Sequence, residues 1–253
     1  MRLPCVDLGT GVRGMSQLYF KQHLAGRDFA QSDAAATQML NFVYAIGDAA
    51  KRECVLVDPA WDVDGLLALL DADGMKLVGA LATHYHPDHV GGSMFGFQVE
   101  GLQRLLALRP VPVHVHRAEA EGIRVVTGLS TSDLVQHDGD DTLPAGDVPI
   151  RFLHTPGHTP GSQCFLVDDH LVAGDTLFVQ GCGRVDLPGG NAEEMYRTLT
   201  QRLAQLPDTV VLYPGHDYGD QPTATLGEQR RTNYALRLGS LDDWLRLMGG
   251  TAW

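Results

Sequence analysis

The feature that most constrains this 253-residue chain is the segment THYHPDH at residues 83–89. It overlaps the end of an apolar stretch that predicts a β-strand. His84 and His86 lie two residues apart in an extended chain, so their side chains point to the same side and can bind one metal ion. Asp88 and His89 follow a proline, where the chain must turn, so they can face a second ion. One short segment therefore predicts two neighbouring metal positions at the end of a strand.

Three more residues of metal-ligand type stand at the ends of later predicted strands. His158 lies in HTPGHTPG, Asp175 in GDT and His216 in YPGHD. Strand ends are places where a rigid sheet can hold side chains around a common point. The pattern predicts that one ion is held by His84, His86, His158 and Asp175. A second ion is predicted at Asp88, His89, Asp175 and His216, so Asp175 would bridge the two.

The rest of the chain alternates between predicted strands and helices, which favours a layered α/β fold. Strands are predicted at 38–48, 53–60, 76–84, 111–116, 148–154, 162–169, 170–178 and 209–216. Helices are predicted at 62–74, 97–108, 118–126, 191–206, 225–236 and 241–248. We expect a single domain over residues 1–253, with an N-terminal arm and first strand region at 1–36 and short C-terminal helices at 222–253.

The charge and the cysteine content limit which classes of binding partner and which cellular compartment we expect. The chain carries 31 Asp and Glu against 19 Lys and Arg, a formal net charge of −12, which argues against binding to nucleic acid or to an anionic membrane. Its four cysteines, at positions 5, 54, 164 and 182, form no CxxC pair and are expected to be free thiols. With no signal-peptide pattern at the start, we expect a cytoplasmic protein.

Four motifs together resemble the metallo-β-lactamase superfamily: THYHPDHVGG (83–92), HTPGHTPGS (154–162), AGDTLF (173–178) and YPGHDYG (213–219). The resemblance extends over roughly residues 39–234. It implies an αββα four-layer sandwich with a metal site at one edge between the two sheets. It also implies ligand roles for His84, His86, Asp88, His89, His158, Asp175 and His216. Within the superfamily, GCGRVDLPGG (181–190) looks like the glyoxalase II and persulfide dioxygenase branch.

This branch implies metal-dependent hydrolysis of a thioester, such as an acylated glutathione, or of a related ester. Two divalent ions, Zn²⁺ first and Fe²⁺ or Mn²⁺ as alternatives, would activate a bridging hydroxide for attack on the carbonyl. Asp88 would also orient that hydroxide. The alternative is a persulfide dioxygenase with one iron held by His84, His158 and Asp175. Pro87, Val185 and Leu187 depart from the residues expected in the oxygenase, which favours hydrolysis.

Two features bear on the small-molecule substrate, which we expect to be an anionic thioester or ester. Arg184 can bind a carboxylate through its guanidinium, although an ion pair with Asp186 is the alternative. The apolar segment 93–110 can be a lid or substrate wall, or a buried helix. The stretch after His216 is shorter than the helical domain with which glyoxalase II holds glutathione. A bulkier, less polar ester, thioester or lactone is therefore a further alternative.

Overall fold

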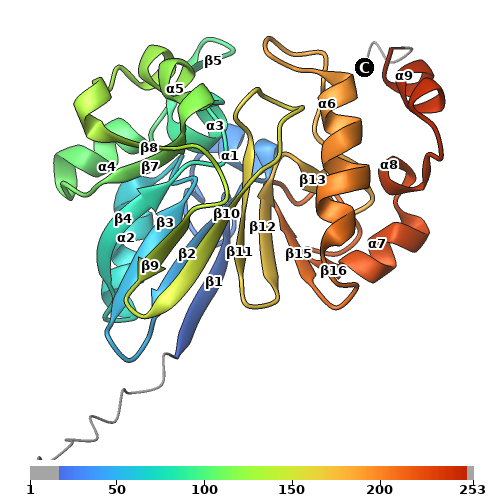
Figure 1. The fold of residues 1–253 in the computed structure, drawn as a ribbon. Coiled ribbons are helices and arrows are strands. Elements are labelled where there is room, and N and C mark those ends of the chain that lie inside the picture. Colours follow the sequence, from blue (N-terminus) through green and yellow to red (C-terminus); the bar gives the residue numbers. More distant parts are fainter. Residues whose placement is uncertain (1–16, 250–253) are drawn as a thin grey trace, which may run out of the picture.

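The computed structural model describes residues 17–249, and two six-stranded sheets form its centre (Figure 1). The first sheet has the order β1 (Leu18–Leu24), β2 (Phe42–Asp48), β3 (Glu53–Val57), β4 (Lys76–Leu81), β7 (Val113–His116) and β8 (Leu134–His137). The second has the order β16 (Ala224–Thr225), β15 (Val211–Pro214), β12 (His170–Gly174), β11 (Gln163–Val167), β10 (Val148–His154) and β9 (Thr142–Ala145). Two short hairpins pair β5 (Gly92–Met94) with β6 (Phe97–Val99) and β13 (Leu177–Phe178) with β14 (Gly181–Cys182).

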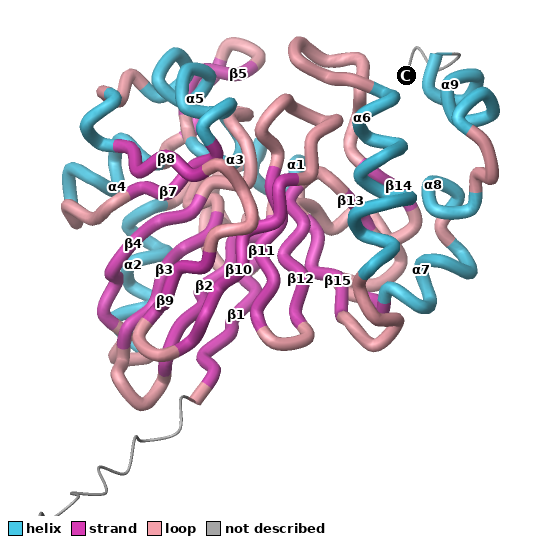
Figure 2. The backbone as a smooth tube through the Cα atoms, in the orientation of Figure 1, coloured by secondary structure: helices cyan, strands magenta, loops and turns pink. Residues whose placement is uncertain are grey.

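Helices cover the outer faces of both sheets (Figures 1 and 2). On the first sheet lie α2 (Val63–Ala72), α4 (Leu102–Leu108) and α5 (Ala120–Thr127), and on the second lie α6 (Ala192–Arg197), α7 (Leu226–Thr232), α8 (Tyr234–Arg237) and α9 (Leu241–Gly249). The short helices α1 (Ala34–Met39) and α3 (Pro87–Val90) lie near the edge where the sheets meet. No helix among the described residues is long and apolar enough to cross a membrane.

The two sheets and the helices on their outer faces form four layers, and apolar side chains fill the three spaces between them. Phe42, Tyr44, Phe152 and Phe165 are among the side chains that fill the space between the sheets. Other clusters fill the space between each sheet and its helices. Because each sheet buries both of its faces and the covering helices each bury one, the αββα sandwich predicted from the sequence is confirmed.

Strand direction brings the loops of the site to one edge. β10 and β12 each run antiparallel to β11, and β15 runs parallel to β12. The loops that follow β10, β12 and β15 therefore leave the same edge of the second sheet. The loop after β4 leaves the first sheet beside them, since Gln163 donates its backbone N–H to the carbonyl of Thr83 at 2.9 Å.

Several predicted elements differ from the observed ones. Residues 97–108 do not form one helix: residues 97–99 form β6, and α4 begins only after Gly101. The region before residue 36 is more than an arm, because β1 pairs with β2 along its whole length. β2 itself begins at Phe42, since α1 occupies residues 34–39. The edge strands β8 and β9 were not predicted; each has only four residues.

The predicted helix 191–206 begins as expected, with the Asn191 side chain accepting from the backbone N–H of Glu194. Regular α-helical geometry ends at Arg197, and a π turn and a 3-10 turn complete the segment. The predicted helix 225–236 is divided at Asn233, whose side chain caps α8. Cys54, Cys164 and Cys182 are free thiols as expected, and position 5 lies outside the described residues.

Candidate metal centre

Three histidines meet at the edge between the sheets. The Nδ1 atom of His86 lies 3.1 Å from His84 Nε2 and 3.0 Å from His158 Nε2. His84 and His86 follow β4, and His158 lies in the loop after β10. We call His84, His86 and His158 the first triad. Its three ring nitrogens surround one point, as the ligands of a single cation would.

A second triad, Asp88, His89 and His216, lies beside the first. His89 Nε2 is 3.2 Å from His216 Nε2, and Asp88 Oδ2 is 3.4 Å from both of these nitrogens. Asp88 and His89 lie on α3, whose first residue is Pro87. Pro87 therefore turns the chain, and the two halves of the THYHPDH segment serve different triads, as the sequence predicted.

Asp175 lies between the two triads, just after β12. Its Oδ1 atom is 3.3 Å from His89 Nε2 and 3.4 Å from His216 Nε2, and its Oδ2 atom is 3.5 Å from His158 Nε2. One carboxylate oxygen thus faces each triad. Although Oδ1 is buried, it has no hydrogen-bond partner in the described structure. A buried, unpartnered carboxylate oxygen among imidazole nitrogens fits a bound cation.

Hydrogen bonds orient the imidazole rings toward the site. The Nδ1–H groups of His158 and His216 donate to the backbone carbonyls of Arg184 and Met39, each at 2.7 Å. His84 Nδ1 donates to Thr83 Oγ1 at 2.9 Å. Each bond fixes the proton on Nδ1 and leaves the Nε2 lone pair facing the triad. These are the outer hydrogen bonds that metal-binding histidines ordinarily make.

The electrostatics of the two triads differ. Burial lowers the pKa of His84 well below its usual range, and burial and the neighbouring His158 lower the pKa of His86 to about 4. Burial alone would also lower the pKa of His216, but the carboxylates of Asp175 and Asp88 outweigh it and raise that pKa to about 9. The first triad is therefore neutral, whereas the second attracts a positive charge.

Asp58 supports this site, and the sequence analysis missed it. It is buried and accepts from His89 Nδ1 at 2.9 Å through Oδ2. It also accepts from the backbone N–H and the hydroxyl of Thr83, at 2.7 and 2.6 Å. Asp58 thus fixes His89 directly and His84 through Thr83. The only sequence signal was its position in an Asp-Pro pair near the end of the strand predicted at 53–60.

Asn41 is a second residue that sequence reasoning missed. Its Nδ2 donates to Asp88 Oδ2 at 3.1 Å, and its Oδ1 accepts from the indole N–H of Trp61 at 3.0 Å. It is 1% exposed and precedes β2. Asn41 therefore holds one oxygen of Asp88 in place, which is an interaction between residues 47 positions apart that no local motif reveals.

Glu119 joins the two loops that carry the first triad. Its carboxylate accepts from the backbone N–H of Tyr85 at 2.8 Å and from that of Gly161 at 2.6 Å. Tyr85 lies between His84 and His86, and Gly161 lies three residues after His158. Glu119 is fully buried, and burial raises its pKa to about 7. A Cβ atom at residue 161 would lie 2.8 Å from the Glu119 side chain, so glycine is required for this approach.

A second HxH pair, His114 and His116 on β7, does not form a metal site. His114 Nδ1 lies 2.9 Å from His137 Nε2, and His116 stacks on His154 with 4.0 Å between ring centroids. Within residues 17–249 neither His114 nor His116 belongs to a group of three metal-ligand side chains.

A cavity of about 450 Å³ opens above both triads. Its wall includes the ligands His86, Asp88, His158, Asp175 and His216, together with Arg184 and the apolar or aromatic residues Met39, Pro87, Met94, Phe95, Phe178, Leu187, Pro188 and Tyr218. The Arg184 guanidinium pairs with both carboxylate oxygens of Asp186, at 2.9 and 2.7 Å. The ion-pair alternative for Arg184 is therefore present in the structure, and a role in binding substrate stays a prediction.

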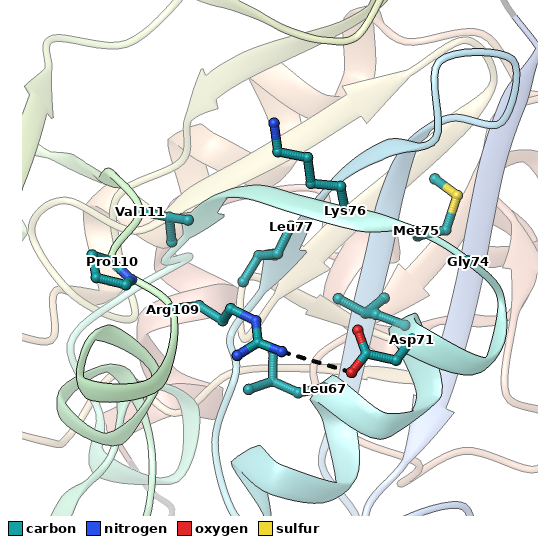
Figure 3. A pocket seen from close by; sticks show the side chains of 10 residues that line it. Leu67, Asp71, Gly74, Met75, Lys76, Leu77, Arg109, Pro110 and Val111 are labelled. Carbon is teal, nitrogen blue, oxygen red and sulfur yellow. Dashed lines mark ion pairs between the residues drawn. The ribbon is translucent and has the colours of Figure 1, made fainter.

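A different hollow lies at the opposite end of β4 (Figure 3). It is formed by the end of α2 and the segment that leads into β7. An ion pair between Arg109 and Asp71, with an N–O distance of 3.7 Å, lies within it. None of the seven predicted ligands lines this hollow. Five of them line the cavity above the triads instead.

An αββα sandwich that gathers five histidines and two aspartates at one edge defines a class of metal-binding α/β proteins. The chain matches the sequence profile of the metallo-beta-lactamase superfamily over residues 37–216. It belongs to that superfamily, as the four motifs predicted.

Relatives of known description include both hydrolases and an oxygenase. The chain is 34% identical over 182 residues to the probable polyketide biosynthesis zinc-dependent hydrolase BaeB of Bacillus velezensis, covering 72% of this chain and 75% of that protein. It is 34% identical over 213 residues to the mitochondrial persulfide dioxygenase ETHE1 of Homo sapiens, covering 82% and 76%. It is also 34% identical over 178 residues to a hydroxyacylglutathione hydrolase of Shewanella, covering 70% and 62%.

Among solved structures, the crystal structure of ETHE1 from Myxococcus xanthus matches with a TM-score of 0.75 and 29% identity, covering 93% of this chain and 92% of that one. The predicted similarity to the glyoxalase II and persulfide dioxygenase branch is thus confirmed. Since relatives of similar identity have different activities, the choice of reaction depends on the arrangement of this site.

Proposed function

We propose that the protein is a metal-dependent hydrolase that uses two divalent ions, Zn²⁺ first, to cleave a thioester or a related ester. The observation that carries this proposal is the position of Asp175, with one oxygen toward each triad. A carboxylate so placed can bridge two cations. When bound, such ions lower the pKa of water so that hydroxide is available near neutral pH, and they polarise a carbonyl.

The chain's own residues would divide the remaining tasks. The first triad would hold one ion and the second triad the other, with Asp175 shared. Asp88 lies on the cavity wall, where Asn41 holds its Oδ2 atom. Asp88 can therefore accept a hydrogen bond from the attacking water and set its direction toward the carbonyl. Arg184 would meet a negative group of the substrate if that group displaced Asp186.

The second candidate is a persulfide dioxygenase with one iron at His84, His158 and Asp175. The similarity to human ETHE1, over 82% of this chain, favours it. The hydrolase would use all seven ligand-type residues, including His86, whose Nδ1 lies within 3.1 Å of both His84 Nε2 and His158 Nε2. A mononuclear site of two histidines and one carboxylate has no use for the second triad.

Metal analysis combined with a second-triad variant tests the proposal. Protein purified without added metal should contain two zinc ions per chain and release thiol from acyl thioesters. His216→Asn should lose one zinc and the hydrolysis, while the control His170→Asn, outside both triads, keeps both. One iron per chain, with persulfide-dependent oxygen uptake that survives His216→Asn, would establish the dioxygenase instead.

A further inference from the structure

We propose that the tip of the β5–β6 hairpin is a substrate wall and that the substrate is an ester or thioester with an extended hydrocarbon group. This inference rests on the hydrolase function proposed above. It starts from Phe95, the residue at the tip of the hairpin that lies beside the metal cavity.

The backbone at this tip favours small residues. Met94 pairs with Phe97, so the hairpin loop has only two residues, Phe95 and Gly96, with φ angles of +50° and +86°. Two positive φ angles define the type I′ turn, for which Asn-Gly is strongly preferred. A bulky side chain in the first position is conformationally costly. Turn geometry therefore gives no reason for a phenylalanine.

Packing against the rest of the protein does not explain a phenylalanine at position 95 either. The Phe95 side chain is 88% exposed, and its ring lies 6.5 Å from that of Phe97. Phe97 in turn stacks on Trp61 at 6.4 Å, which anchors the base of the hairpin. The hairpin is thus attached to the core through Phe97, while Phe95 extends beyond it. An aromatic ring held in water on a costly turn points to a ligand that covers it.

The position of Phe95 indicates which ligand that is. Met94 and Phe95 line the cavity that also contains Asp88 and His158. Leu187 and Pro188 belong to the same wall, and so do Phe178 and Tyr218, whose rings pack edge to face at 5.5 Å. Apart from the metal ligands, the one charged side chain of this lining is Arg184, already paired with Asp186. Such a lining favours a hydrocarbon over a polar carrier arm.

The test uses zinc-loaded protein and simple thioesters. One series keeps the thiol N-acetylcysteamine and changes the acyl group from acetyl to octanoyl; the other keeps acetyl and changes the thiol to octanethiol. We expect kcat/KM to rise at least about tenfold along one series, which identifies the side of the carbonyl that meets the wall. Phe95→Gly should reduce that preference about tenfold, mainly through KM, without lowering the melting temperature.

Val125→Ala is the matched control, since Val125 is 73% exposed and lies outside the cavity. It should leave the chain-length preference unchanged. Binding of octanoate, measured by calorimetry, provides a readout without turnover and should weaken in Phe95→Gly by a similar factor. Equal kcat/KM values along both series, or an unchanged chain-length preference in Phe95→Gly, would contradict the proposal that the hairpin tip is a substrate wall. If no thioester were hydrolysed, the proposed hydrolase function would be contradicted instead. Octanoate binding would still test whether the hairpin tip is a substrate wall.

Discussion

The two triads have the same number of side chains but different electrostatics. The first triad has three histidines that burial keeps neutral, with the pKa of His86 at about 4. The second contains Asp88 and faces Asp175, which together raise the pKa of His216 to about 9. The first triad therefore offers lone pairs without charge, and the second offers negative charge that a cation can neutralise. Removing the shared carboxylate should affect both triads, whereas changing the pH and removing the outer supports should affect them differently.

Asp175→Ala should have the largest effect, because Asp175 faces both triads. We expect loss of both metal ions and of hydrolysis to background. Elemental analysis and a thiol-release assay measure the two losses, and circular dichroism verifies that the variant is folded. Asp169→Ala, on the exposed β11–β12 turn, is the control. Full metal content in Asp175→Ala would refute the bridging role.

Lowering the pH should release the metal of the second triad first. In the metal-free protein His216 is protonated below about pH 9, so protons compete with a cation there, whereas His86 remains neutral above about pH 4. The carboxylates of Asp88 and Asp175 also raise the pKa of His89, so between pH 6 and 8 the affinity of one zinc site should rise at least about tenfold per pH unit, and that of the other should change little. Zinc titrations by calorimetry at several pH values will measure this. Parallel pH dependence of both sites would contradict the electrostatic difference.

The same shift has a consequence for the metal-free protein. The folded-state pKa of His216 is raised from 6.5 to about 9. The stabilisation from its proton is therefore complete below about pH 6.5 and disappears as the pH rises through 9. Denaturant unfolding should show the metal-free protein losing stability over this range. In His216→Asn that loss should be smaller.

Asp58→Asn should weaken the second triad more than the first. His89 would lose its charged acceptor, while Thr83 would keep partial support. Removal of such an outer partner typically lowers metal affinity 10- to 100-fold. Competition with a chromogenic chelator will measure the affinity of each site. A larger loss at the first site would indicate that Asp58 acts mainly through Thr83.

Glu119→Gln should have the smallest effect and should act on the first triad. An amide in place of the carboxylate presents an N–H group to one of two backbone donors, which should loosen the link between Tyr85 and Gly161. We expect about a tenfold loss of affinity at the first site. Glu121→Gln, which changes an exposed carboxylate paired with Arg124, is the control. A loss confined to the second triad would assign Glu119 a different role.

Local patterns predicted which side chains gather at the candidate metal centre. His84, His86, Asp88 and His89 occur within six residues, and the strand and turn around them determine their directions. His158, Asp175 and His216 were each placed at the end of a predicted strand. The structure brings all seven together.

The supporting residues were not predictable in the same way. Asn41, Asp58 and Glu119 act through contacts with residues 25 to 47 positions away, and such pairing depends on how the sheets pack. The hairpin at 92–99 was missed because its apolar residues also fit a helix. Only the two-residue loop at Phe95 and Gly96 distinguishes the two.

Neither triad is complete on one sheet. His84 and His86 follow a strand of the first sheet and His158 a strand of the second, and the same division separates Asp88 and His89 from His216. Metal binding would therefore fasten the two halves of the sandwich together, and its free energy would add to their cohesion. The centre can form only after the halves have docked. Chelation should accordingly speed separation of the sheets and expose the inter-sheet core to proteases.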